Sequence, residues 1–171
     1  IFGGNIVWDF LELEKLSLRY GAELRADIVE NAGLYSTRYR IRTSTIRQDA
    51  VNWLSLGSFI EAELDMSQSF RAIVGLRGDH TQYEVEAFQE INSGFGEGSI
   101  LNPKFSIIYS LNERTELYAN YGKGFHSNDV RGRTVTKDPI TGNKITPVDL
   151  FVNQIGYEVG SRFEQDDGSN L

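Results

Sequence analysis

The sequence predicts an all-β protein built from antiparallel strands. Apolar and polar residues alternate along several segments, and a period of two indicates a strand whose two faces meet different environments. Short polar turns follow some of these segments, and long polar stretches follow the others. The composition, with 17 Gly, 3 Pro and 12% aromatic residues, suits a chain of strands and turns.

The alternation is clearest in residues 16–28. There every second residue from Leu16 to Ile28 is apolar, and the residues between them are polar or Gly, which is not a helical period. A polar turn at 110–114 separates two further alternating runs, so these runs predict a hairpin. The predicted strands are 5–10, 16–28, 50–64, 69–83, the two runs on either side of 110–114, and 153–164.

The connections alternate in length along the chain. Antiparallel neighbours place successive connections at opposite ends of a sheet, so all short turns are expected at one end and all long loops at the other. Outer-membrane barrels have this asymmetry, and the predicted strands reach the ~9–11 residues that a tilted membrane strand needs. The short connections are 11–15, 65–68, 111–114 and 165–170, and the long ones are 29–49, 84–99 and 127–152.

Residues 102–133 carry a more specific signal. They contain Pro-Lys-Phe at 103–105, Glu-Leu-Tyr-Ala-Asn-Tyr-Gly at 116–122 and Gly-Phe-His-Ser-Asn-Asp-Val-Arg-Gly at 124–132. These motifs resemble the barrel domain of TonB-dependent outer-membrane receptors. Looser matches are Gly-Leu-Tyr at 33–35 with Ser-Thr-Ile-Arg at 44–47, Gly-Leu-Arg-Gly-Asp at 75–79, and Gly-Tyr-Glu-Val-Gly-Ser-Arg at 156–162.

The resemblance implies an incomplete antiparallel up-and-down transmembrane β-barrel. Residues 1–171 would be a partial barrel domain of about seven strands, where such transporters close with about 22. We therefore expect an open, twisted sheet in the bacterial outer membrane. The resemblance also implies TonB-energised uptake of a scarce solute, such as a ferric siderophore, cobalamin or a glycan, through a plug and a TonB box that are not visible here. The implied partners are outer-membrane lipid, the TonB complex and a small-molecule or metal-chelate ligand.

Composition argues against several other classes of protein. The chain has no Cys, so it has neither disulfides nor a thiolate metal site, and its two His cannot build a His-rich metal site. A net charge of −7 argues against a nucleic-acid partner. No phosphate-binding loop, nucleophile elbow or metal-ligand spacing is present, so we predict no catalytic residues, no cofactor and no enzyme activity.

If the apolar face meets lipid, the polar face lines a wet interior. Charges of mixed sign on neighbouring strands can pair across the ladder, which makes them structural, or they can contact a plug or a passing solute. Glycines on the same face indicate either close approach of a plug or strand curvature. The predicted wall residues are Arg19, Glu23, Arg25, Glu61, Arg71, Arg77, Glu116, Glu158 and Arg162.

A second candidate group lies at the start of the longest loop. His126 continues the inward parity of Gly122 and Gly124, so we expect it to project into the lumen near the outer rim. One interpretation is contact with ligand or plug, because His, Asp and Arg bind polar solutes. The other is a local turn in which Asn128 or Asp129 satisfies its own backbone. The group is His126, Asn128, Asp129, Arg131 and Arg133.

Two other functions stay open at this point. A soluble β-sandwich, for example a carbohydrate-binding module, would bury the apolar face between two sheets. A passive porin-like barrel would need no plug. The sandwich predicts that one core contains Leu18, Leu24, Leu54, Ile60, Val74 and Ile107.

Overall fold

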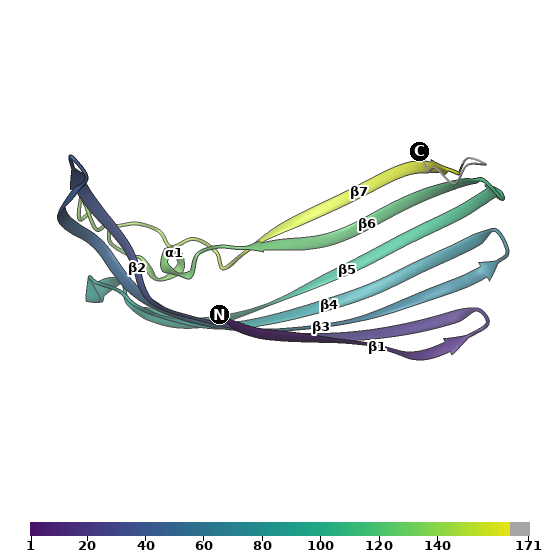
Figure 1. Cartoon of the computed structure of the whole chain (residues 1–171), viewed down its shortest axis with the longest axis horizontal. Coiled ribbons are helices and arrows are strands. Elements are labelled where there is room, and N and C mark those ends of the chain that lie inside the picture. Colours follow the sequence, from purple (N-terminus) through teal and green to yellow (C-terminus); the bar gives the residue numbers. More distant parts are fainter. Residues whose placement is uncertain (165–171) are drawn as a thin grey trace.

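The computed structural model describes residues 1–164 as one antiparallel sheet of seven strands, ordered as they follow in the chain (Figure 1). β1 and β7 form its two edges, so the sheet is open, as predicted. The expected turn at 165–170 lies outside the described residues. The elements are β1 (Phe2–Leu13), β2 (Leu16–Arg38), β3 (Ile41–Ser67), β4 (Phe70–Glu86), η1 (Glu90–Asn92), β5 (Gly94–Asn112), β6 (Thr115–Ser127), α1 (Val130–Thr134) and β7 (Phe151–Phe163).

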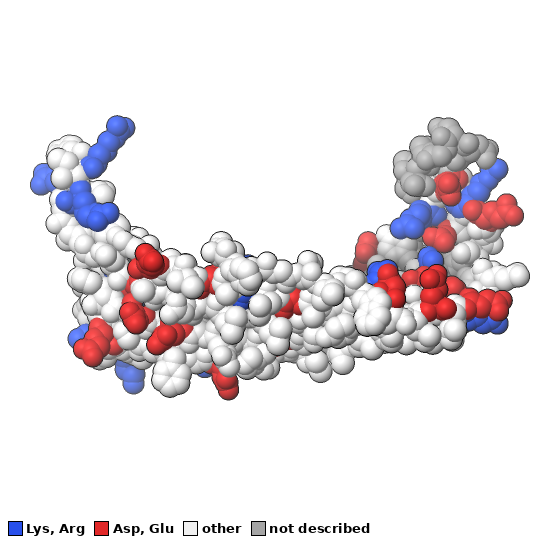
Figure 2. All heavy atoms as spheres, turned by 60° about the horizontal axis from the view of Figure 1, so that its bottom comes forward, with Lys and Arg blue, Asp and Glu red and all other residues white. Residues whose placement is uncertain are grey.

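Within residues 1–164, no second layer of protein covers the apolar face of the sheet. Leu24, Leu54, Ile60 and Val74 remain 39%, 44%, 47% and 46% exposed, which contradicts the sandwich alternative. In Figure 2 the visible face of the sheet is largely uncharged along its middle, and charged side chains gather toward its two ends. None of the helices within residues 1–164 is long and apolar enough to cross a membrane.

The predicted asymmetry of the connections holds only in part. Tight turns join β1 to β2, β3 to β4 and β5 to β6 at one end, as predicted (Figure 1). At the other end longer connections join β4 to β5 and β6 to β7, but the turn between β2 and β3 is also tight. Residues 137–144 form a hairpin tip within the last long connection, since Lys137 pairs with Lys144 and Gly142 donates to the Asp138 carbonyl oxygen at 2.9 Å.

The prediction of a long loop at 29–49 was wrong. β2 continues to Arg38 and β3 begins at Ile41, so the segment is a hairpin that extends the sheet. Its turn residues, Tyr39 and Arg40, have φ of 52° and 66°, the left-handed values of a tight hairpin turn. Alternation fails here because both faces are polar, but the β-branched residues still favour extended backbone.

The prediction for 84–99 was wrong in its boundaries. β4 runs to Glu86 and β5 begins at Gly94, and the two are joined by η1. Pairing between them reaches Val85 and Gly94, which leaves only a short irregular connection. The error has the same cause as in the β2–β3 hairpin, because a strand beyond the apolar band carries no apolar alternation.

The long connection between α1 and β7 folds back onto the polar face of the sheet. Val130 and Leu150 are buried there against Val51, Tyr83 and Val85, in a cluster that we call the loop anchor. Tyr83 and Val85 face inward because they lie on the same face of β4 as Arg77 and Asp79. Trp53 and Phe151 pack against the loop anchor from its edge.

β6 separates from β5 toward the end of the sheet where the long connections lie. β5 pairs with β4 as far as Gly94, but with β6 only from Lys104 to Asn112. The ladder stops beside Pro103, which has no N–H to donate. β6 continues as a ribbon with β7 to Ser127 and enters α1 from there.

We predict that Leu150→Ala loosens the long connection without unfolding the sheet. Truncating a buried Leu costs about 2–5 kcal/mol, and Leu150 is a member of the loop anchor. Amide hydrogen exchange of the full-length protein should become faster in residues 128–150 and stay unchanged in β2–β4. Val148→Ala is the control, because Val148 is 45% exposed. Equal exchange in both variants would contradict the anchor.

Candidate functional site

A hollow of about 360 Å³ lies on the inner face, between the wall and the segment that leads into α1. β2, β3 and β4 supply its wall, and residues 125–129 supply its other side. It combines aromatic faces, hydroxyl groups and charged side chains. Its lining is Glu23, Arg25, Asp27, Trp53, Ser55, Gly57, Arg77, Asp79, Thr81, Phe125, Ser127, Asn128 and Asp129.

Arg77 is the centre of the polar network in this hollow. Its Nη2 donates to Asp79 Oδ1 at 2.7 Å and to Glu23 Oε2 at 3.1 Å. The strand register places Glu23, Gly57 and Asp79 in one row across three strands. Because Gly57 has no side chain, the guanidinium lies over β3 and joins β4 to β2.

The same arrangement recurs closer to the short turns. The row Glu61, Gly75 and Lys104 crosses β3, β4 and β5, and Lys104 Nζ donates to Glu61 Oε2 at 2.7 Å. Glycine in the middle strand again lets a cation reach a carboxylate two strands away.

The structure brings the predicted wall residues into polar pairs. Arg19 Nε donates to Asp9 at 2.7 Å, and Arg25 Nη2 donates to Asp27 at 2.7 Å. The remaining pairs are Arg71–Glu63 at 3.3 Å, Arg162–Glu116 at 3.5 Å, and Glu158 with the donors Tyr118 at 3.1 Å and Asn120 at 3.2 Å.

Rings cover several inward-facing glycines. A Cβ on Gly21 would overlap the ring of Phe59, and one on Gly160 would overlap the ring of Tyr118. At these positions the glycine makes room for a neighbouring strand's ring. Gly122, Gly124 and Gly156 have nothing within 4 Å of an added Cβ, so their surfaces stay open.

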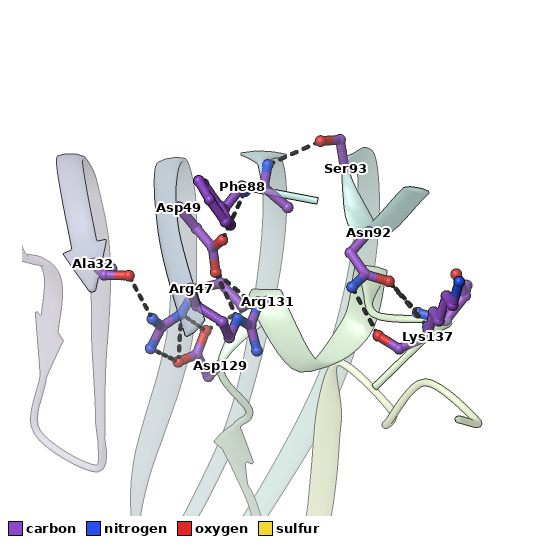
Figure 3. A network of polar contacts seen from close by, with 11 residues as sticks. Ala32, Arg47, Asp49, Phe88, Asn92, Ser93, Asp129, Arg131 and Lys137 are labelled. Carbon is purple, nitrogen blue, oxygen red and sulfur yellow. Dashed lines mark hydrogen bonds and ion pairs between the residues drawn. The ribbon is translucent and has the colours of Figure 1, made fainter. Parts of the chain in front are cut away.

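The rim residues mostly hold the long connection in place. Asp129 caps α1, because its Oδ1 accepts from the Arg131 N–H at 2.9 Å. Asn128 Nδ2 donates to the Asp149 carbonyl oxygen at 2.7 Å, and Arg133 Nη1 donates to that of Val148 at 3.4 Å. Arg131 Nη1 reaches the wall at the Ala32 carbonyl oxygen, at 3.4 Å (Figure 3).

His126 is not among the residues that line the hollow. Phe125 and Ser127 line it instead, and His126 lies between them with the opposite parity and is exposed. β6 leaves β5 above Gly122. The expectation that His126 projects into the lumen near the outer rim stays a prediction.

Sequence reasoning missed two buried residues that support the hollow from above. Asp49 Oδ1 accepts from the Phe88 N–H at 3.1 Å, and Arg47 Nε donates to its Oδ2 at 2.8 Å. Asn92 accepts from the N–H groups of Thr136 and Lys137, both at 3.0 Å, and donates to the Lys137 carbonyl oxygen at 2.8 Å (Figure 3). Arg47 and Asp49 share a strand face, which becomes visible only once β3 is known to begin at Ile41.

The described residues contain no group of three or more His, Cys, Asp or Glu that could hold a metal ion. The guanidinium groups in the hollow are already held by carboxylates, so they act as fixed hydrogen-bond donors. Trp53 and Phe125 add flat apolar surfaces. Together these groups can hold a solute by hydrogen bonds and ring contact.

Comparisons with known proteins agree with this arrangement. A family described as TonB dependent receptor-like, beta-barrel, matches residues 2–169. Two solved structures share the fold at 14% identity over 96% of this chain: the copper transporter OprC, with a TM-score of 0.67, and the ferric yersiniabactin uptake receptor FyuA from Yersinia pestis, with a TM-score of 0.70. This chain spans only 28% and 26% of their lengths. No curated protein sequence matches it.

We predict that Gly57→Ala breaks the bridge between β2 and β4. The new Cβ would lie 2.6 Å from both Arg77 Nη2 and Asp79 Oδ1, so the guanidinium must leave its place over β3. Overpacking of this kind costs about 1–3 kcal/mol. Thermal unfolding of the full-length protein in detergent measures the loss.

Gly75→Ala is the matched control for that substitution. Its Cβ would meet no atom closer than 3.6 Å, so the Lys104–Glu61 pair can stay. Equal destabilisation by Gly57→Ala and Gly75→Ala would contradict the prediction that stability depends on the Arg77 guanidinium lying over Gly57 of β3.

We also predict that docking of residues 128–134 weakens in acid. The hydrogen bonds from Arg131 hold the pKa of Asp129 below its ordinary value. The contribution of Asp129 is therefore complete above about pH 4, the ordinary Asp pKa, and is lost as pH falls through the lowered pKa of the folded state. Asp129→Asn keeps a capping side chain but removes the titration. Hydrogen exchange of this segment between pH 5 and 2.5, corrected for intrinsic exchange, should lose part of its pH dependence in the variant; identical profiles would contradict the prediction.

Proposed function

Because the chain belongs to the TonB-dependent receptor β-barrel family, we propose that it forms part of the wall of a transporter whose solute contacts the inner-face hollow. Members of this family are outer-membrane proteins and transporters, not enzymes. The outward apolar face then lies against lipid, and the charged face lines the wet interior.

The observation that carries the proposal is the position of the hollow. It lies on the inner face, at the end of the sheet where the long connections gather, and the segment between β6 and α1 forms one of its sides (Figure 1). A solute entering from the long-loop end meets Phe125, Asn128 and Trp53 there. Ring contact and fixed hydrogen-bond donors favour a compact polar solute, such as a small molecule or a metal chelate.

Energy for uptake is proposed to come through TonB. This part of the proposal is supported by membership of the TonB-dependent receptor β-barrel family. The two similar solved structures are a copper transporter and a ferric yersiniabactin uptake receptor, which favours a metal-related cargo for this chain as well.

We predict that Trp53→Ala and Phe125→Ala each weaken uptake about tenfold or more, through a higher half-saturating concentration. Losing ring contact costs about 1–3 kcal/mol, and a factor of ten corresponds to 1.4 kcal/mol. The full-length receptor would first be matched to its solute by uptake of labelled ferric siderophores, cobalamin and oligosaccharides. The variants are then compared with that solute.

His126→Ala is the control, because His126 is exposed and does not line the hollow. An effect of His126→Ala as large as that of Phe125→Ala would contradict the role of the hollow. Uptake that persists in cells without TonB would favour the passive porin-like alternative.

A further inference from the structure

We propose that the hairpin between β2 and β3 captures the transported solute, and that this solute is an anionic metal chelate with carboxylate oxygens. The inference rests on the proposed transport and adds the charge of the solute. Residues 31–48, which we call the basic hairpin, contain four Arg and neither Asp nor Glu, in a chain whose net charge is −7. The four are Arg38, Arg40, Arg42 and Arg47.

Three of these arginines have no anionic partner. Arg47 is neutralised by Asp49, whose Oδ2 lies 2.7 Å from Arg47 Nη2. Arg38, Arg40 and Arg42 are exposed, and within residues 1–164 no carboxylate pairs with any of them. The basic hairpin therefore holds three positive charges that can bind an anion.

The hollow does not supply this selectivity itself. Its guanidinium groups, from Arg25 and Arg77, are already bound to Asp27 and Asp79, at 2.7 Å in each case. Its lining also contains more carboxylates than guanidinium groups. An anion is thus attracted to the molecule by the basic hairpin rather than by the hollow.

One of the free guanidinium groups is held in a fixed orientation. Arg42 Cζ lies 3.3 Å from the centroid of the Tyr35 ring. Tyr35 is itself positioned, because its hydroxyl donates to Asn31 Oδ1 at 3.2 Å and its ring occupies the space that a Cβ on Gly33 would fill. Stacking uses the face of the guanidinium and leaves its N–H edge free to bind a carboxylate through two parallel hydrogen bonds.

The basic hairpin lies at the end of the sheet from which the proposed solute enters. Arg131 of α1 donates to the carbonyl oxygen of Ala32 at 3.4 Å, so the base of the hairpin is bonded to the segment that follows the side of the hollow at 125–129. Figure 1 shows the hairpin rising on the side where α1 lies, and Figure 2 shows basic side chains at its tip. This position beside the inward-folded connection favours a solute over the phosphate groups of membrane lipid.

The unpaired charges act first on the rate of capture. A positive patch attracts an anion across about one Debye length, roughly 8–10 Å at physiological ionic strength, and raises the association rate about 10- to 1,000-fold. Added salt screens this attraction. Binding of an anionic chelate should therefore weaken as the salt concentration rises, whereas binding of a neutral chelate should not.

The test compares two ferric chelates that differ in charge. Ferric citrate is an anionic carboxylate chelate, and ferrichrome is a neutral hydroxamate chelate. Their equilibrium binding to the purified full-length receptor in detergent is measured with radioactive iron at low and at high salt. We expect the wild type to prefer ferric citrate at low salt. Arg38→Gln, Arg40→Gln and Arg42→Gln combined should weaken its binding about tenfold or more at low salt and less at high salt.

Two further variants separate position and geometry from total charge. Lys15→Gln is the matched control for Arg40→Gln, because each removes one positive charge from a hairpin turn and the two turns lie at opposite ends of β2. Arg40→Gln should weaken ferric citrate binding, and Lys15→Gln should not. Tyr35→Leu keeps every charge but removes the ring under Arg42, so it should weaken ferric citrate binding and leave its salt dependence unchanged.

The proposal is overturned if the wild type binds ferrichrome as tightly as ferric citrate or binds neither chelate. It is also overturned if the triple variant binds ferric citrate like the wild type; loss of co-purified lipid A from that variant would then assign the basic hairpin to lipid phosphate. Trp53→Ala separates this inference from the proposed role of the hollow. If the triple variant loses ferric citrate and Trp53→Ala does not, the hollow fails and the basic hairpin stands.

Discussion

A sheet one layer thick has no interior behind it, and this constraint governs the structure. Each face must suit its own surroundings without help from a packed core. The outward face presents a band of exposed aliphatic side chains to its surroundings. On the inner face it is a lattice of charges in which Arg77 and Lys104 each cross a glycine to reach a carboxylate two strands away. Glycine thus lets the wall be held together by polar bonds that span three strands.

The loop anchor is the exception to the single layer. It shapes the end of the sheet where the long connections lie. Val130 and Leu150 come from opposite ends of one long connection and meet the same inward residues of β3 and β4. Polar contacts through Asn92 and Arg131 fasten the same connection to the wall at two further points. The connection is therefore part of the wall's inner lining, and the hollow exists because the connection folds inward.

The sequence predicted the elements that meet lipid and failed for those that extend beyond it. Residues 16–28 and 153–164 alternate because one face is apolar and the other polar, and their assignments hold. Residues 29–49 are also strand, but both of their faces are polar and no alternation marks them. The pairing of the wall charges followed from parity alone. The role of His126 at the outer rim stays a prediction, because β6 no longer pairs with β5 at that point and parity alone does not give its neighbours. Asp49 and Asn92 became important through burial under a connection whose path no local pattern encodes.

Because the β5–β6 ladder ends beside Pro103, β5 and β6 respond separately to force at the end of the sheet where the long connections lie. Below that point, tension on one strand is shared with its neighbour through backbone hydrogen bonds. Above it, β6 pairs with β7 and no longer with β5. A pull on the end of β6 that leads into α1 is therefore shared with β5 only below the Lys104–Gly122 pair.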